Sequence, residues 1–319
     1  MKARAPRNQT LICTDAELDE LSAGLLRVSS EASVDLVTNR VVHQDFAEVV
    51  SLLPRGFVDL IVVDPPYNLT KNYGGRVFRS KEASAYISWF EGILSSLLPL
   101  LRPTASVYVC SDWKTSSLIF PVLDEHLHVR NRITWEREKG RGAKLNWKNN
   151  TEDIWYCTVG DQYHFDVDAV KLKRRVIAPY RSGDGRPKDW EETETGNYRL
   201  TYPSNIWSDI SIPFWSMSEN TDHPTQKPEK LIAKLILASS RPGDFVFDPF
   251  LGSGTTAVVA QKLGRRFCGI EENREYCCWA LKRLKQAESD ESIQGYADGV
   301  FWERNSLNGR KTKRGRQDC

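Results

Sequence analysis

The order of apolar and polar positions along the chain predicts short strands that alternate with helices. Apolar runs bounded by turn residues predict strands at residues 40–43, 58–63, 106–110, 128–135, 153–159, 245–248 and 265–271. Helical periodicity predicts helices or helical turns at residues 14–28, 47–53, 84–101, 229–240 and 256–264. This alternation is typical of an α/β fold built on a mostly parallel sheet with helices on both faces.

Two of the predicted helices have recognisable ends. Thr14 is placed to cap the first helix, and Glu17 is placed to close a capping box with it. The helix at 84–101 carries apolar residues on one face, and we expect Arg102 and Pro103 to end it before the next strand.

A chemically equipped turn follows the strand at 58–63. That strand is almost wholly apolar, as strands buried on both faces are, and Pro65 and Pro66 end it by removing backbone donors. Asp64 and Tyr67 therefore lie at the carboxyl end of a buried strand. Ligands bind at such ends in open α/β sheets.

A glycine-rich turn follows the strand at 245–248. Gly252, Gly254 and Ala257 fit the G-x-G-x-x-A spacing of dinucleotide-binding folds. The acidic residue of that fingerprint has a counterpart in Glu271, at about the usual ~20-residue distance. Taken alone, the turn indicates a nicotinamide enzyme. A P-loop is disfavoured, because no Gly-Lys-Ser/Thr sequence follows.

Asp248 favours a cationic ligand at this turn. A carboxylate four residues before the glycine would gain nothing from pyrophosphate but would attract an ammonium or a sulfonium. The sequences DPPY at 64–67 and FLGSG at 250–254 resemble the two motifs of the S-adenosylmethionine-dependent amino-methyltransferases of DNA. The first motif lies near the amino terminus and the second near the carboxyl terminus, an order that resembles the β class of this family.

The resemblance covers roughly residues 34–135 and 220–285. It implies a doubly wound, Rossmann-like methyltransferase sheet whose motif order is permuted, with an inserted target-recognition region. The expected divisions are an N-terminal extension at 1–33, a catalytic half at 34–135, a target-recognition insert at 136–218, a cofactor-binding half at 219–303 and a basic tail at 304–319.

The first motif supplies the predicted catalytic residues Asp64, Pro65, Pro66 and Tyr67. Within the family, Asp at the first position usually accompanies methylation of adenine N6, whereas Ser accompanies cytosine N4. Asp64 and the Pro65 carbonyl can accept both N–H bonds of the amine without offering a competing donor. Tyr67 offers a face for a base flipped out of the duplex. Transfer is then a direct in-line displacement at the sulfonium methyl group.

The cofactor roles also come from the resemblance. Glu271 suits the ribose hydroxyls, Asp45 suits the adenine amine of the cofactor, and Asp248 or its neighbours suit the methionine ammonium. Thr225 to Lys227 match a further cofactor-pocket motif of the family, although by spacing alone residues 223–228 are only a helix-starting turn. The predicted cofactor-binding residues are Asp45, Asp64, His223, Pro224, Thr225, Lys227, Asp248, Phe250, Gly252, Ser253, Gly254, Thr255, Glu271, Glu272 and Asn273.

Charge and composition suggest nucleic acid as a partner and argue against disulfide and metal sites. The net charge is only +2, but basic residues exceed acidic ones between 130 and 190 and are interleaved with aromatic residues, as on a nucleic-acid face. On charge alone, an ordinary solvated surface explains this region equally well. The seven cysteines lack C-x-x-C spacing, so we expect reduced thiols, with Cys110 in the core. His126 and His128 lack a matching ligand cluster, and no metal is predicted.

These features predict a site-specific DNA adenine methyltransferase that forms the modification half of a restriction–modification system. The alternatives are a cytosine-N4 methyltransferase and a non-catalytic nucleic-acid-binding protein on the same fold. A nicotinamide enzyme is less favoured than either. S-adenosylmethionine is the predicted cofactor and duplex DNA the predicted partner, and a homodimer is left open. No apolar run approaches the ~20 residues that span a bilayer, so we expect a cytoplasmic protein without a membrane partner.

Overall fold

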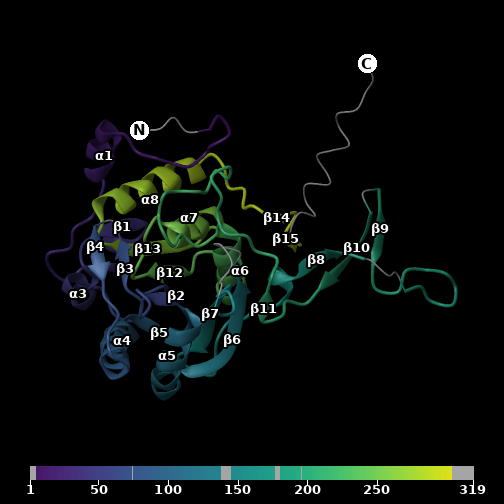
Figure 1. Ribbon diagram of the computed structural model, residues 1–319, viewed down its shortest axis with the longest axis horizontal. Coiled ribbons are helices and arrows are strands. Elements are labelled where there is room, and N and C mark those ends of the chain that lie inside the picture. The colour runs from purple at the N-terminus through teal and green to yellow at the C-terminus, as the bar shows by residue number, and fades with distance from the viewer. Residues whose placement is uncertain (1–4, 74, 138–144, 177–179, 195, 304–319) are drawn as a thin grey trace.

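The computed structural model describes residues 5–303 except 74, 138–144, 177–179 and 195 (Figure 1). The predicted basic tail at 304–319 lies outside the described residues, as do three basic residues of the insert, Lys139, Arg141 and Lys144.

Eight strands form the central sheet. Their spatial order is β1 (Arg40–His43), β13 (Arg266–Glu271), β12 (Phe245–Asp248), β2 (Val58–Val63), β5 (Leu101–Ser111), β7 (Thr151–Thr158), β6 (His128–Glu136) and β11 (Ile206–Trp207). Neighbouring strands are parallel except where β7 pairs with β5 and β6. Strands β12 and β13, from late in the chain, lie between β1 and β2. The predicted doubly wound sheet with exchanged halves is confirmed.

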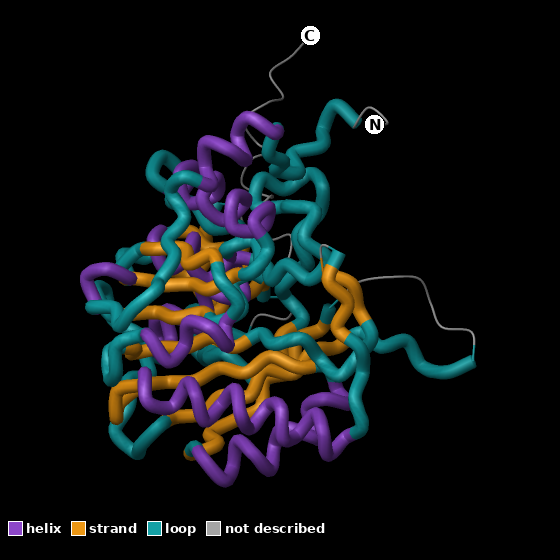
Figure 2. Tube along the Cα trace, turned by 90° about the vertical axis from the view of Figure 1, so that its left-hand side faces the viewer, coloured by secondary structure: helices purple, strands orange, loops and turns teal. Residues whose placement is uncertain are grey.

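Helices cover both faces of this sheet (Figure 2). On one face, α4 (Ala83–Leu97) and α5 (Trp113–His126) share a core with Ile61 of β2. On the other, α6 (Glu229–Ser239), α7 (Thr255–Lys262) and α8 (Arg274–Ala287) share a core with Leu60 and Val62. Successive strand residues alternate between the two cores, as the period of a strand requires. The short helices are α2 (Val34–Val37), α3 (Phe46–Val49) and the 3₁₀ turns η1 (Val50–Leu52), η2 (Leu98–Leu100) and η3 (Asp168–Val170).

The N-terminal extension contributes helix α1 (Asp15–Ser22), which packs on α8. The predicted capping box is confirmed: Thr14 Oγ1 accepts from the Glu17 N–H at 3.3 Å, and the Glu17 carboxylate accepts from the Thr14 N–H at 2.8 Å. Ion pairs from Arg274 and Lys282 of α8 to acidic residues of α1 hold the two helices together.

Helix α4 ends earlier than the sequence pattern predicts. The α-helix stops at Leu97, and Pro99 continues in a single 3₁₀ turn before β5 begins at Leu101. Proline has no N–H to donate and disfavours helical geometry in the residue before it. Arg102 and Pro103, expected to close the helix, therefore lie inside the strand.

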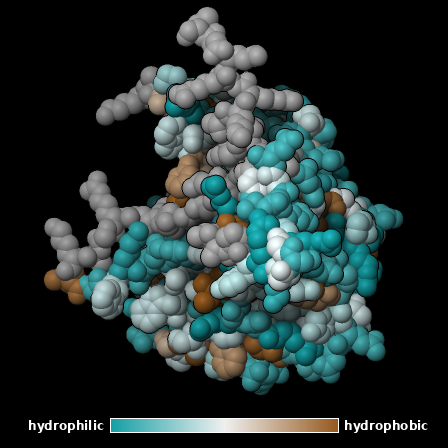
Figure 3. All heavy atoms as spheres, turned by 90° about the vertical axis from the view of Figure 1, so that its right-hand side faces the viewer, coloured by the Kyte–Doolittle hydropathy of each residue, from teal (hydrophilic) through white to brown (hydrophobic). Residues whose placement is uncertain are grey.

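A second sheet stands beside the central one. Its strands are β14 (Tyr296–Ala297), β15 (Val300–Trp302), β8 (Leu172–Arg175), β10 (Gly196–Thr201) and β9 (Glu191–Thr193) in spatial order. The expected insert thus divides: β7 and β11 join the central sheet, while β8, β9 and β10 project to the right in Figure 1. That side is largely hydrophilic (Figure 3). A small hairpin of β3 (Lys71–Tyr73) and β4 (Arg76–Phe78) follows the DPPY turn. Among the described helices, none is long and apolar enough to cross a membrane.

Candidate active site

A cavity of about 710 Å³ opens at the carboxyl ends of β1, β2, β12 and β13. Both motif turns therefore meet at one edge of the sheet, as the topology requires. The predicted site residues that line the cavity are Asp45, Asp64, Pro65, Pro66, Tyr67, His223, Thr225, Phe250, Gly252, Glu271 and Glu272. The predicted residues that do not line it are Pro224, Lys227, Asp248, Ser253, Gly254, Thr255 and Asn273.

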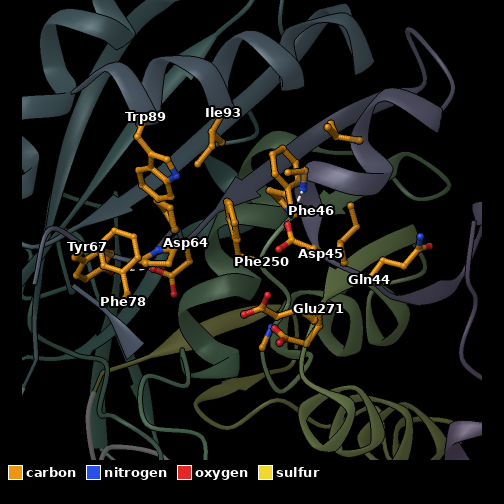
Figure 4. A pocket seen from close by; sticks show the side chains of 18 of the residues that line it. Gln44, Asp45, Phe46, Asp64, Tyr67, Phe78, Trp89, Ile93, Phe250 and Glu271 are labelled. Atoms are coloured by element: carbon orange, nitrogen blue, oxygen red, sulfur yellow. Dashed lines mark hydrogen bonds between the residues drawn. The ribbon is translucent and has the colours of Figure 1, made fainter. Parts of the chain in front are cut away.

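Asp64, Tyr67 and Phe78 lie together at one end of the cavity (Figure 4). The Tyr67 hydroxyl donates to Asp64 Oδ1 at 2.9 Å, and Lys227 Nζ donates to Asp64 Oδ2 at 2.5 Å. Burial raises the pKa of Tyr67 well above its usual value, so its hydroxyl keeps the proton that it donates. Both carboxylate oxygens of Asp64 thus accept a hydrogen bond from a neighbouring side chain.

Lys227 lies behind Asp64 rather than against the cavity. Its Nζ also lies 3.3 Å from Glu152 Oε2, at the start of β7. Burial alone would lower the pKa of Lys227, but the carboxylates of Asp64 and Glu152 outweigh this and raise it above its usual value. Glu152 was not predicted as a site residue, and its only signal in the sequence is an acidic residue where an apolar strand begins.

Apolar side chains form the middle of the cavity. Phe250 lies between the Asp64 end and the Asp45 end, and Trp89 and Ile93 reach down from α4 (Figure 4). The rings of Phe46 and Phe250 are 5.3 Å apart between centroids. Such walls suit a flat ring system. Phe46, Trp89 and Ile93 were missed because only the folded sheet brings α3 and α4 over the glycine turn.

Two carboxylates face the other end. Glu271 Oε2 accepts from the Gly252 N–H at 2.9 Å, and Oε1 accepts from the Asn273 N–H at 2.8 Å. Burial raises the pKa of Glu271 to about 7. Asp45 caps α3 by accepting from the Ala47 N–H at 2.9 Å. Glu271 therefore ties the glycine turn to the end of β13 while keeping a face toward the cavity.

The glycines of the turn allow two close approaches. Gly252 has a φ of +54°, and a Cβ there would lie 3.0 Å from His223 Nε2 in the cavity wall. Gly254 has a φ of +88°, and a Cβ there would lie 2.5 Å from the Cβ of Ala280 in α8. A side chain at Gly254 is therefore excluded by both backbone geometry and packing.

The remaining residues of the turn face the protein interior. Asp248 is buried beneath it, where Oδ1 accepts from the Phe250 N–H at 2.9 Å and burial raises the pKa of the carboxyl to about 7. Arg283 donates to the Ser253 carbonyl and to Thr255 Oγ1, at 2.9 Å each. In this conformation Asp248 does not reach the cavity, and its role toward an ammonium stays a prediction.

The other candidate residues lie apart from the cavity. Cys110 is buried, and burial raises its pKa well above the usual value, as expected for a core thiol. His126 approaches Glu91 and His128 approaches Asp161, each at 3.5 Å, so the two histidines do not converge on one point. Among the described residues, Glu91, Glu125 and His126 bring potential ligand atoms within 4.8 Å of one another.

Comparison with known proteins identifies the family. The sequence model of the N6/N4 DNA methylase family matches residues 58–282. The chain belongs to this family of DNA methylases. It is 33% identical over 254 residues to the DNA adenine methyltransferase YhdJ of Escherichia coli K12, covering 77% of this chain and 83% of the relative. It is 32% identical over 248 residues to the type II methyltransferase M.HpaI of Haemophilus parainfluenzae, covering 77% and 74%.

A solved structure shares the fold. The PvuII DNA methyltransferase, described as cytosine-N4-specific, aligns with a TM-score of 0.57 at 17% identity, covering 82% of this chain and 92% of that one. The Rossmann-like methyltransferase architecture predicted from the two motifs is therefore confirmed.

S-adenosylmethionine, the methyl donor predicted from the motifs, is the cofactor of this family of DNA methylases. The described residues fit it. The apolar middle of the cavity suits the adenine ring, and the carboxylates of Glu271 and Asp45 can accept hydrogen bonds from hydroxyl and amine donors. Gly252 leaves room for the ligand, because a Cβ at this position would narrow the cavity.

Proposed function

We propose that this DNA methylase transfers the methyl group of S-adenosylmethionine to the N6 amine of adenine in one specific sequence of duplex DNA. The observation that carries the proposal is the single cavity with Asp64 and Tyr67 at one end and Asp45 and Glu271 at the other. A base held at the first end and a cofactor held at the second would meet near Phe250 (Figure 4).

The chain supplies orientation rather than covalent chemistry. An adenine amine is a weak nucleophile, because its lone pair is delocalised into the ring. Asp64 and the Pro65 carbonyl accept the two N–H bonds and leave the lone pair directed at the donor. Lys227 and Tyr67 already hold Asp64, so little reorganisation is needed when the base arrives. When bound, S-adenosylmethionine would supply an electrophilic methyl group: its bond to sulfur would break as the bond to N6 forms in line, sulfur would leave as a neutral thioether, and the methylated amine would release one proton.

The target base must leave the duplex to reach Asp64, because base pairing hides its amine. Tyr67 provides the face on which the flipped base stacks, a contact of about 1–3 kcal/mol by comparison with other aromatic platforms. Its ring is fixed by the bond from its hydroxyl to Asp64. Stacking thus offsets part of the cost of flipping.

Adenine is favoured over cytosine by Asp64 at the first motif position and by the adenine methyltransferase among the relatives. We also propose a particular similarity to the RsrI adenine methyltransferase, which rests on the motif sequences alone. Type II methyltransferases among the relatives support a role as the modification half of a restriction–modification system. A cytoplasmic location follows from duplex DNA as substrate, and a homodimer is left open.

The second sheet is our candidate for the target-reading region. Strands β8, β9 and β10 come from the expected insert and carry several of its cations. Tyr180 lies exposed between β8 and β9, and Trp147 and Lys148 lie exposed between β6 and β7 of the central sheet. Cations position a protein on phosphates, and aromatic side chains contact bases.

Mapping the methylated bases tests the proposal. The chain is expressed in a host that lacks DNA amine methylation, and modified positions in the host DNA are read by single-molecule sequencing. We expect N6-methyladenine within one short sequence, and none with Asp64→Ala. N4-methylcytosine instead would support the cytosine alternative, and no modification by a folded chain that binds DNA would support the non-catalytic alternative.

A further inference from the structure

Three charged side chains, Lys227, Glu152 and Arg137, lie directly behind Asp64. Glu152 is 3% exposed and Lys227 is 8% exposed. Lys227 Nζ lies 2.5 Å from Asp64 Oδ2 and 3.3 Å from Glu152 Oε2. Arg137 Nη1 pairs with the other oxygen of Glu152, Oε1. The charge cluster, defined as Asp64, Glu152, Arg137 and Lys227, therefore holds two carboxylates and two cations and carries no net charge.

The topology of the sheet brings these residues together. Strand β7 runs antiparallel to its neighbour β5, so it begins at the carboxyl edge where β2 ends. Val62 of β2 and Ile154 of β7 both belong to the core beneath α6. Side chains two residues along a strand share a face, so Asp64 and Glu152 point to that same side. Lys227 lies just before α6 and fills the space between them.

We propose that Lys227 and Glu152 are positioning residues for methyl transfer. Lys227 orients Asp64 toward the target amine, and Glu152 balances the charge of the lysine so that Asp64 stays available as an acceptor. The proposal rests on the proposed role of Asp64. It differs from the motif resemblance, which assigns Lys227 to the cofactor pocket and gives Glu152 no role.

Charge balance explains why both residues are needed. Without Lys227, the carboxylates of Asp64 and Glu152 would remain close together with only Arg137 to compensate them, and their repulsion would move Asp64 away from its present position. Without Glu152, the two cations would have only Asp64 as a counter-charge. A buried charge left without its partner is costly, whereas removing both members of a pair is often nearly neutral. The double variant should therefore recover the part of the loss in Lys227→Met that comes from charge imbalance, but not the part that comes from losing the lysine's bond to Asp64.

Tyr67 links the charge cluster to the base platform. Its hydroxyl donates to Asp64 Oδ1 at 2.9 Å and lies 3.4 Å from Glu152 Oε2, and Lys227 Nζ lies 3.2 Å from the same hydroxyl oxygen. A shift of the lysine would therefore change the hydrogen bonds of both Asp64 and Tyr67. Loss of balance should slow methyl transfer without altering the Glu271 end of the cavity.

Two further titratable side chains face the cluster, Cys110 of β5 and Asp248 of β12. Burial raises the pKa of Cys110 well above its usual value, so the thiol is uncharged. Burial raises the pKa of Asp248 to about 7. Variants are therefore compared at one pH above 8, where Asp248 carries the same charge in each.

The test is a double-mutant cycle of Lys227→Met and Glu152→Gln in the full chain. The measurement is the single-turnover rate of tritiated methyl transfer to duplex DNA at saturating cofactor. Breaking a buried pair costs several kcal/mol, so we expect Lys227→Met to lower the rate at least about 100-fold and the double variant to regain at least about tenfold. S-adenosylmethionine affinity should stay within about twofold of wild type in all three variants, as expected for an interaction confined to the transfer step.

Lys262→Met is the matched control. Lys262 is 10% exposed through its side chain and pairs with Glu229 Oε2 at 2.8 Å, away from the cavity. It should lower the melting temperature without slowing transfer. If the double variant transfers no faster than Lys227→Met, or if Lys227→Met loses cofactor affinity as much as rate, the inference is wrong.

Two further measurements distinguish a failure of this inference from a variant that does not fold and from a failure of the proposed function. If Lys227→Met does not fold, Glu152→Gln alone must still slow transfer at least about tenfold with unchanged cofactor affinity, and a wild-type rate overturns the inference. An inactive wild-type chain would instead contradict the proposed function. In that case the cycle is read from melting temperatures, where the same recovery in the double variant is required.

Discussion

At the scale of single residues, our proposal assigns methyl transfer to Asp64 above all. We expect Asp64→Ala to lower the single-turnover rate by at least about 10²–10³-fold, the usual cost of removing a preorganised polar group from the reacting centre. Cofactor affinity should change little, because the cofactor carboxylates lie at the opposite end of the cavity. Equilibrium dialysis and rate measurements on the same preparation test this. Equal losses in affinity and rate would move Asp64 into the cofactor site.

Glu271 carries the corresponding prediction for the cofactor. We expect Glu271→Ala to weaken S-adenosylmethionine binding by about 1–3 kcal/mol, the scale of a charge-assisted hydrogen bond. Part of this loss comes from the Gly252 and Asn273 N–H groups that Glu271 now satisfies. DNA affinity, measured in parallel, should be unchanged. Wild-type cofactor affinity would mean that Glu271 only supports the turn.

The raised pKa of Glu271 predicts a pH dependence. Hydroxyl donors bind the ionised carboxylate, and burial raises its pKa to about 7, so cofactor affinity should fall as pH drops through 7. Folding responds in the opposite direction, because a buried carboxyl with a raised pKa favours the folded state more as it becomes protonated. Titration calorimetry between about pH 6 and 8.5 measures the pH dependence of cofactor affinity. In Glu271→Gln, which keeps Asp248, a large part of the change of cofactor affinity with pH should disappear. A change of affinity with pH as large as in the wild type would contradict the assignment.

Sequence motifs anticipated the residues that touch the cavity better than those that support them. Asp64 and Tyr67 follow an apolar strand within a few residues and Glu271 is the last residue of another, so local pattern and topology place them. The bond between Lys227 and Asp64 spans 163 residues, and nothing in the local sequence of either residue predicts it. Asp248 shows the converse: its position in the motif suggested a ligand, but the backbone of Phe250 turns its side chain inward.

At the scale of elements, the glycine turn packs closely against α8, and it can do so because Gly254 has no side chain. We expect Gly254→Ala to destabilise the fold by about 2–5 kcal/mol, the sum of about 1–2 for left-handed geometry and about 1–3 for overpacking. Gly264→Ala is the control, because Gly264 also has a positive φ, +71°, but nothing lies within 4 Å of its would-be Cβ. Chemical unfolding measures both variants. Equal losses would show that packing against Ala280 contributes nothing.

The bounds of elements followed from sequence where a local signal sets them. The first helix begins at its Thr14 capping box, and the strand at 40–43 agrees with the predicted range. Helix α4 ended early because Pro99, rather than Pro103, is the first proline that the helix meets. The strand at 153–159 was also predicted, but its place between β5 and β6 depends on pairing with distant residues.

At the scale of the whole molecule, the second sheet is expected to contact DNA. Replacing Lys173, Arg174 and Arg175 together should weaken DNA binding and reduce its salt dependence by about one unit for each phosphate that the variant no longer neutralises. Lys173 lies over the ring of Trp302, 5.0 Å from its centroid, and Arg174 lies 3.8 Å from Glu303. Arg175 is exposed, so Arg175→Ala alone should account for much of the effect.

The matched control for that titration is Lys285→Ala, which removes an exposed cation in the last turn of α8, outside the second sheet. It should leave both DNA affinity and salt slope unchanged. A triple variant that keeps the wild-type affinity and slope would mean that this run is an ordinary solvated surface and that DNA is read elsewhere.

The most direct test of the account is the identity of the base that receives the methyl group in vitro. Purified chain is incubated with duplex DNA and tritiated S-adenosylmethionine, and the DNA is digested to nucleosides and separated. We expect the label in N6-methyladenine, dependent on Asp64. Label in N4-methylcytosine, or label that persists in Asp64→Ala, would contradict the account.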